Sequence, residues 1–210
     1  MKVRGFPGHR TMTVYPYPAA KETAMPSGPA PHTTSPAPAG ASGCRLLLVR
    51  HAKAEPKQES AEDIGRSLSE RGRADAARTG RWLAESAFEP ALVLCSPARR
   101  TRETWQLMAA ALADPPDAVY DERLYGAEPN AMVTVLAQRA AGLGCVALVG
   151  HSPSVQEMAS ALCGSGAPEL LEALAAGFPT AGVAVVDLPG GWDALTPGTG
   201  TLTAFRAPGG

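Results

Sequence analysis

Three apolar segments of this 210-residue chain are each followed by polar side chains that could bind an anion. Residues 46–49 are followed by Arg50 and His51, and the segment CVALVG is followed by His151. Between them, ALVLC is followed by SPARR, which ends on Arg100. A planar guanidinium binds phosphate oxygens in pairs, and a neutral imidazole can attack phosphorus. Arginines together with histidines therefore favour the binding and transfer of a phosphoryl group.

The surroundings of these side chains support the same chemistry. Neighbouring arginines repel a proton on His51 and so lower the pKa of its imidazole, which keeps the ring neutral and nucleophilic. Helices predicted to begin just after SP and HSP would add backbone N–H donors that face the anion. Each dipeptide alone is weak evidence, so the prediction depends on all three segments lying close together.

The segments around these residues predict how they are brought together. Strands buried on both faces are expected at 44–49, 91–95 and 145–150, and amphipathic helices at 69–86, 97–112 and 153–163. Weaker strands are expected at 118–120, 183–188 and 201–206, and further helices at 129–142 and 168–176. Strands that alternate with helices predict a three-layer α/β/α sandwich with a mainly parallel central sheet. The carboxyl ends of parallel strands share one edge, where ligands bind.

Composition narrows the possible partners and the compartment. The chain has 20 acidic and 19 basic residues, so its net charge of -1 predicts no binding to nucleic acid or membrane. No apolar run is long enough to span a bilayer, and the N-terminus lacks the apolar centre of a secretion signal, so a cytoplasmic protein is expected. Residues 1–43, rich in Pro, Gly and Ser, are expected to be a disordered tail, with Met12 or Met25 as alternative starts, and residues 44–210 to form the domain.

Three other catalytic motifs fit the sequence poorly. The segment GHSPS resembles the serine nucleophile motif G-x-S-x-G, but Pro153 lacks the N–H that the oxyanion hole requires, and no histidine follows His151. A cysteine phosphatase requires C-x5-R, and Thr101 stands at the arginine position after Cys95. Neither a Walker A motif nor an HxxxH or HExxH metal motif is present, so chemistry without a metal or cofactor is expected.

Together these motifs resemble the histidine phosphatase superfamily, which includes the phosphoglycerate mutases. The resemblance extends from Arg45 to Val186, and the motifs occur in the family's order. It implies that His51 is the nucleophile that accepts the phosphoryl group, and that Arg50 and Arg100 bind phosphate. It also implies that His151 binds the phosphoryl group and stabilises its charge in the transition state. Arg99 is an alternative to Arg100, although the S-x-x-x-R spacing favours Arg100.

Within this superfamily the chain resembles the small SixA-type phosphohistidine phosphatases. The segment DIGRSLSERG is similar to a segment of that subgroup, and the short connections imply little or no lid insertion over the phosphoglycerate mutase-like fold. A phosphorylated protein, carrying phosphohistidine, is therefore the expected substrate. Ala52 and Thr101 differ from the usual glycine and alanine of the family. The segment DERLYG resembles an acidic family segment, which makes Glu122 a candidate general acid, with a solvated loop carboxylate as the alternative.

Two alternatives remain open on the sequence alone. The first is a phosphomonoesterase or mutase that acts on a small phosphorylated metabolite. The second is a catalytically silent member of the superfamily that binds phosphoproteins as an interaction module.

Overall fold

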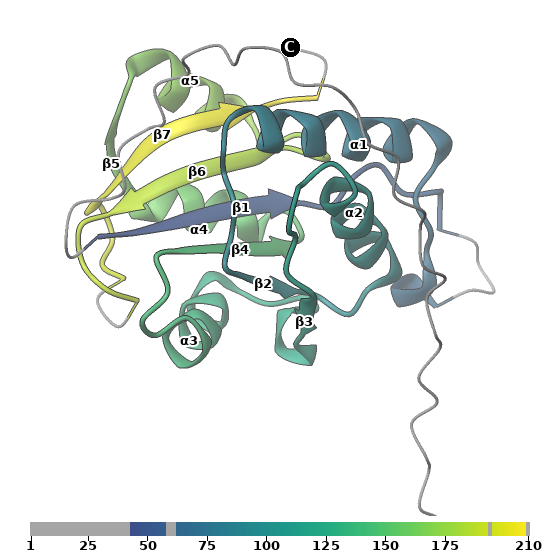
Figure 1. The fold of residues 1–210 in the computed structure, drawn as a ribbon, viewed down its shortest axis with the longest axis horizontal. Helices are drawn as coiled ribbons and strands as arrows, with labels where there is room; N and C mark the ends of the chain where they lie inside the picture. Colours follow the sequence, from purple (N-terminus) through teal and green to yellow (C-terminus); the bar gives the residue numbers. More distant parts are fainter. Residues whose placement is uncertain (1–42, 58–61, 193–194, 209–210) are drawn as a thin grey trace, which may run out of the picture. The chain divides into compact units, whose positions relative to one another are not determined.

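A computed structural model describes residues 43–57, 62–192 and 195–208 of the protein. The predicted tail of residues 1–43 lies outside these residues, apart from Gly43. Seven strands form one sheet in the order β3-β2-β4-β1-β6-β7-β5 (Figure 1). The strands are β1 Cys44–Arg50, β2 Leu92–Cys95, β3 Ala118–Tyr120, β4 Cys145–Gly150, β5 Cys163–Gly166, β6 Val183–Leu188 and β7 Gly200–Arg206. Of these, only β6 runs antiparallel to its neighbours, so the predicted mainly parallel sheet is confirmed.

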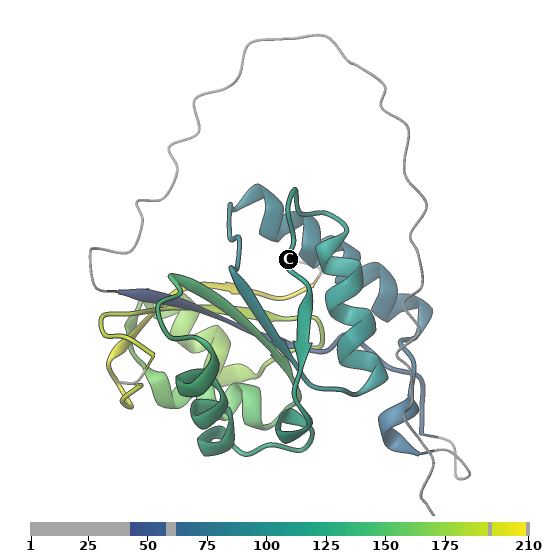
Figure 2. The same cartoon turned by 60° about the horizontal axis from the view of Figure 1, so that its bottom comes forward.

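Helices cover both faces of the sheet (Figure 2). They are α1 Glu70–Glu85, α2 Arg99–Ala109, α3 Pro129–Arg139, α4 Ser154–Leu162 and α5 Pro168–Ala176. One buried cluster joins one face to α1 and α2, and a second joins the other face to α3, α4 and α5. The three-layer α/β/α sandwich is therefore confirmed. None of the helices in the described ranges is long and apolar enough to cross a membrane.

The central strand β1 shows why its middle, residues 46–49, is apolar without interruption. Leu46 and Leu48 point into the α3–α4–α5 cluster, whereas Leu47 and Val49 point into the α1–α2 cluster. All four side chains are fully buried. A strand that is covered on both faces needs apolar residues at every position, because successive side chains point to opposite faces.

Local signals explain where the helices begin. The Ser69 hydroxyl accepts a hydrogen bond from Gly72 N at 3.1 Å, which caps α1 as its sequence predicts. The connections 96–98 and 151–153 join β2 to α2 and β4 to α4 with no inserted helix. Strand β5 was not predicted, because its residues CGSG lack an apolar pattern and its pairing with β7 supplies the order instead.

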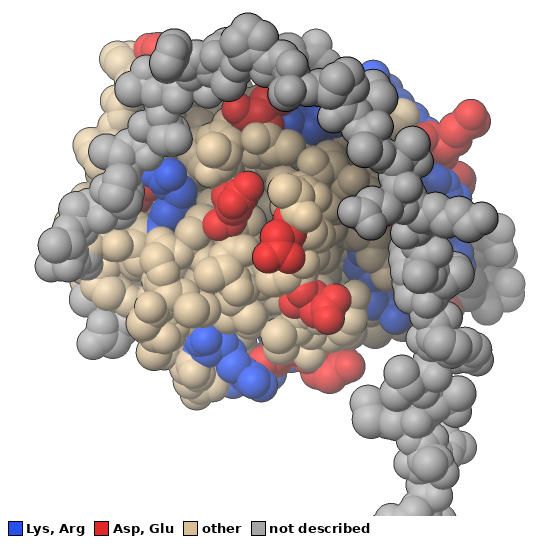
Figure 3. Space-filling view, in the orientation of Figure 1, with Lys and Arg blue, Asp and Glu red and all other residues tan. Residues whose placement is uncertain are grey.

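The surface agrees with a net charge close to zero. Figure 3 shows acidic and basic side chains on the same face, with uncharged residues between most of them. No broad area of a single charge is present on the visible surface of the described residues.

Candidate active site

The residues predicted to act together meet at one edge of the sheet. Strands β2, β4 and β1 are parallel neighbours, so their carboxyl ends lie side by side. His51 N bonds Gly150 O at 3.0 Å, and Ser96 N bonds Val149 O at 3.0 Å. These bonds hold the residues that follow the three strands in adjacent positions. As a result, the ring centroids of His51 and His151 lie 5.3 Å apart.

One nitrogen of His51 is fixed and the other is left free to react. His51 Nδ1 lies 2.7 Å from Ala52 O. Because a carbonyl oxygen can only accept, Nδ1 carries the proton and Nε2 keeps its lone pair. Burial, together with the smaller effect of the charges of Arg100, Arg50 and Arg66, lowers the pKa of His51 to about 4 against the opposing effect of the Ala52 hydrogen bond. His51 is therefore a neutral imidazole with a free nitrogen, as nucleophilic attack requires.

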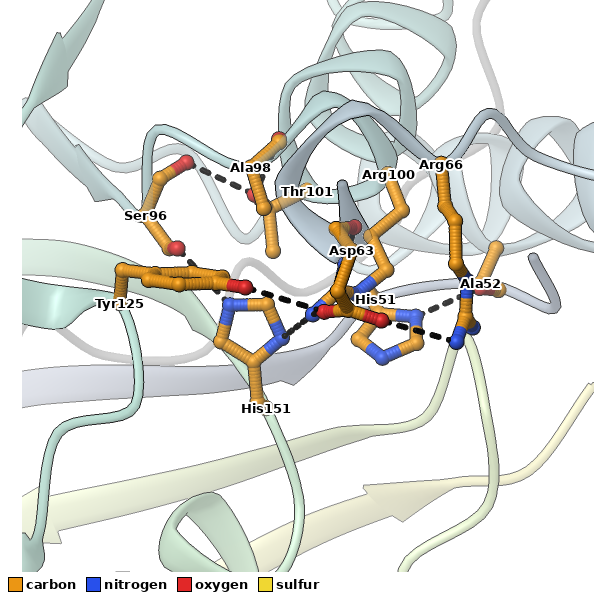
Figure 4. A network of polar contacts seen from close by, with 10 residues as sticks. All are labelled: His51, Ala52, Asp63, Arg66, Ser96, Ala98, Arg100, Thr101, Tyr125 and His151. Atoms are coloured by element: carbon orange, nitrogen blue, oxygen red, sulfur yellow. Dashed lines mark hydrogen bonds and ion pairs between the residues drawn. The ribbon is translucent and has the colours of Figure 1, made fainter. Parts of the chain in front are cut away.

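His151 is held by polar contacts on both ring nitrogens. Arg100 Nη2 lies 3.3 Å from Nδ1, and Ser96 Oγ lies 2.8 Å from Nε2 (Figure 4). Since a guanidinium can only donate, Nδ1 accepts and Nε2–H donates to Ser96. Burial, followed by the charge of Arg100, lowers the pKa of His151 to about 3. The ring of Tyr125 meets His151 edge-on, with 5.8 Å between the centroids.

Arg100 is anchored by Asp63, a site contact that the sequence reasoning missed. Arg100 Nη1 donates to Asp63 O at 2.8 Å, and Nη2 pairs with Asp63 Oδ2 at 3.0 Å. Asp63 also accepts from the Tyr125 hydroxyl and from Arg66, each at 3.0 Å (Figure 4). Burial alone would raise the pKa of Asp63, but the Tyr125 hydrogen bond and the two guanidiniums lower it below its ordinary value. Asp63 is therefore a carboxylate at neutral pH.

Arg50 reaches the site from the other end of the same edge. Its Nη1 donates to Phe178 O, in the segment that leads into β6. Its Nε is buried and has no hydrogen-bond partner among the described residues. Burial lowers the pKa of Arg50 from its ordinary value. A buried guanidinium with an unused donor at this position can bind an anion.

The two departures from the family pattern are accommodated locally. Ala52 is fully buried, and its N–H donates to Thr104 Oγ1 at 2.9 Å. The Thr101 hydroxyl donates to Ser96 O and Ala98 O, both at 2.7 Å. Thr101 therefore stabilises the turn that carries Ser96, the residue that contacts His151.

Glu122 stands apart from the other predicted residues. Its side chain is exposed in the short 3-10 turn Glu122–Leu124, and it forms no hydrogen bond or ion pair with the described residues. Cys95, the other nucleophile considered, is buried, and burial raises the pKa of its thiol to about 12. Within the described ranges, no three His, Cys, Asp or Glu side chains are grouped as a metal site would require.

Comparisons with known proteins show which family the sequence is similar to. The sequence model of the histidine phosphatase superfamily, branch 1, matches residues 46–127. An uncharacterized protein of Mycobacterium tuberculosis is 33% identical over 162 residues, which are 76% of this chain and 99% of that protein.

Solved structures agree with that match. A structure from Agrobacterium tumefaciens, provisionally named the phosphohistidine phosphatase SixA, is 33% identical, with a TM-score of 0.67 over 79% of this chain and 98% of the other. A structure from Nakamurella multipartita with the same provisional name is 25% identical, with a TM-score of 0.70 over 81% and 99% of the two chains.

Proposed function

Because the chain belongs to the SixA-type subgroup of the histidine phosphatase superfamily and is a phosphatase, we propose that its substrate is phosphohistidine on a protein. The observation that carries the proposal is the arrangement of His51, whose Nδ1 is held by Ala52 O, whose ring centroid lies 5.3 Å from that of His151, and whose imidazole feels the charges of Arg100 and Arg50. The provisional name of the Agrobacterium tumefaciens relative supports phosphohistidine as the substrate class.

In the first step, His51 accepts the phosphoryl group. Its Nε2 lone pair attacks phosphorus, a new N–P bond forms, and the bond from phosphorus to the substrate imidazole breaks. The leaving imidazole takes the bonding electron pair, and water supplies the one proton that leaves it as a neutral ring. Arg50 and Arg100 bind the phosphoryl oxygens, and their positive charges stabilise the transition state. His151 is neutral while the site is empty, and the negative charge of a bound phosphoryl group would favour its protonation, after which it donates to the same oxygens.

In the second step, water attacks the phosphorus of phospho-His51. Inorganic phosphate leaves, and His51 Nε2 regains its lone pair. This chemistry needs no metal, because the guanidiniums supply the positive charge. Glu122 remains a predicted general acid, and protonation matters less here than for an ester, because imidazole leaves from phosphorus more readily than an alkoxide does.

The test compares wild type with His51→Ala on a histidine-phosphorylated protein, phosphoserine and sugar phosphates. We expect wild type to prefer the phosphohistidine protein and to form an acid-labile phosphoenzyme. His51→Ala should form no phosphoenzyme, and it should hydrolyse the phosphohistidine protein at least about a thousandfold more slowly than wild type. His32→Ala is the control, because His32 belongs to the N-terminal segment outside the described residues. A chelator should leave the rate unchanged.

Three results would contradict the proposal. Normal turnover by His51→Ala would exclude the phospho-His51 intermediate. A preference for sugar phosphates would identify a small-metabolite phosphatase, and Glu122→Gln should then slow the reaction. Phosphoprotein binding by wild type without phosphate release would indicate an interaction module.

A further inference from the structure

A groove lies next to the candidate site, on the side formed by two connections of the chain. Ser152, Pro153 and Gln156, at the start of α4, line one part of it, and residues 176–179, which link α5 to β6, line another. Arg50 belongs to both the groove and the candidate phosphate site. The groove is largely open to solvent, and its volume of about 680 Å³ is more than a phosphoryl group fills.

Two polar atoms of the groove residues are buried and unused. Arg50 Nε and Ser152 Oγ have no hydrogen-bond partner among the described residues. Leaving a buried polar group unpaired costs about 1–3 kcal/mol, so such groups usually have a partner in the functional state. Both residues line the groove, so a ligand that extends from the phosphate site into it would lie next to both unused groups.

From these observations we infer that the groove binds the polypeptide chain that flanks the phosphorylated residue of the substrate. The inference rests on the proposed function and adds to it a surface that distinguishes a protein from a small molecule. Its occupant is therefore a peptide segment that is continuous with the phosphorylated side chain.

Charge favours a peptide over a small anionic metabolite. Arg50 is the one charged side chain that lines the groove in the described part of the chain. A metabolite with a second phosphate or carboxylate would need a second cation, because charged groups that lose water require a charged or well-bonded partner. Peptide groups are neutral and combine a donor with an acceptor. Gln156 offers both, and its Nε2 is engaged only in a long 3.4 Å bond to Leu174 O.

The walls are suited to a main chain more than to one particular side chain. Phe178 is buried, and its ring packs against Phe205 with 5.2 Å between centroids, so the ring offers little surface to a ligand. Pro153 and Ala176 are exposed and small, and Gly177 has no side chain. Such walls select little for sequence, so we expect the enzyme to accept histidine-phosphorylated peptides of varied sequence.

The experiment measures kcat/KM for two substrates with the same P–N bond. One is a peptide phosphorylated on histidine, and the other is phosphoramidate, which has no polypeptide. The ratio of interest is kcat/KM for the peptide divided by kcat/KM for phosphoramidate. Ala176→Trp should fill the groove and lower this ratio by about tenfold. Gln156→Ala should lower the ratio in the same direction. Ala175→Trp is the matched control, since Ala175 is the preceding exposed residue of α5 and lies outside the groove, and its ratio should equal that of wild type.

The outcomes separate this inference from the proposed function. An unchanged ratio in Ala176→Trp, with both substrates hydrolysed, would overturn the groove and leave the phosphatase intact. An equal fall of the ratio in Ala175→Trp would show that the effect comes from α5 as a whole. This result would also overturn the inference about the groove. If wild type hydrolysed neither substrate, the proposed function would be overturned, and the inference about the groove would fail with it.

Discussion

At the scale of single residues, burial keeps both imidazoles of the site uncharged at neutral pH. His51 and His151 have their pKa values lowered to about 4 and about 3, well below the ordinary value of about 6.5. A positively charged His51 could not attack phosphorus. The burial that lowers these pKa values therefore preserves the nucleophile.

This lowered pKa gives a pH prediction with a definite sign. The unfolded chain binds protons at these histidines more readily than the folded protein, so stability is complete above about pH 6.5 and decreases as pH falls toward about 4. NMR titration of the His51 ring should show no transition near pH 6.5 and one near pH 4. The melting temperature should fall over the same interval. An ordinary His51 titration near pH 6.5 would contradict this account.

Asp63 supports a second prediction at this scale. Its carboxylate occupies Arg100 Nη2, which is also needed by a phosphoryl oxygen, while Arg100 Nη1 is held independently by Asp63 O. Asp63→Asn should remove the competing charge and keep the backbone anchor. We expect inorganic phosphate to inhibit this variant at a concentration about five times lower, which is the effect of removing one nearby charge at a partly exposed site.

Asp121→Asn is the control for this measurement. Asp121 also pairs with an arginine, Arg123, but has no contact with either histidine of the site. Its phosphate inhibition should match wild type. Weaker inhibition of Asp63→Asn by phosphate would show that the carboxylate is needed to position Arg100.

The site residues differ in how visible they are in the sequence. Arg50, His51 and His151 directly follow apolar strands, and for that reason the sequence predicts them. Asp63 lies in a short turn far from any strand end and reaches Arg100 across 37 positions of the chain. The family-like segment DIGRSLSERG begins at Asp63, but the contact with Arg100 depends on how two connections pack, which neither that motif nor hydrophobic periodicity reports.

At the scale of elements, α1 and α2 approach each other closely because Gly80 has no side chain. A Cβ at this position would lie 2.5 Å from Met108 O and 2.6 Å from Met108 Cα. Both atoms belong to the backbone of α2, so no side-chain rotation could relieve the contact. Arg100, which contacts His151, is the second residue of α2.

Gly80→Ala should therefore lower the free energy of unfolding, by about 2 kcal/mol after the gain in helix propensity is subtracted. Urea unfolding measures this change. Gly144→Ala is the control, because a Cβ there meets no atom within 4 Å, and its stability should equal or exceed that of wild type. A stable Gly80→Ala variant would show that α1 can move away from α2 at little cost.

The sequence predicts a strand or a helix where the burial of its side chains follows a regular pattern. The middle of β1 and the whole of β4 are apolar because helices cover both faces, and the amphipathic helices α1, α2 and α4 show the matching period. Strand β5 is half exposed and contains two glycines, so nothing in its composition indicates a strand. The reversed direction of β6 is set by pairing with β1, which local sequence does not encode.

At the scale of the whole molecule, the catalytic fold is expected to function without the N-terminal segment. The Mycobacterium tuberculosis relative is matched over 99% of its own length by 76% of this chain. The structure from Agrobacterium tumefaciens is likewise matched over 98% of its length. Both proteins therefore consist almost entirely of the region that they share with this chain.

A protein consisting of residues 43–210 should keep the melting temperature and kcat/KM of the full chain. Calorimetry and a phosphohistidine assay on both proteins would test this. Because the buried clusters lie entirely within residues 44–202, the truncation removes no described core residue. A large loss of stability would show that the segment before residue 43 contributes to the fold.

The reversed strand β6 has a consequence for how such proteins could diversify. Because it runs against β1, the chain enters β6 at the edge where β1 ends, and this brings Phe178 O to Arg50. An insertion or deletion between α5 and β6 would therefore move the Arg50 side chain and reshape the groove. It would do so without replacing any phosphate-binding residue. Evolution, or an engineer, could change the preferred substrate through the length of this one connection.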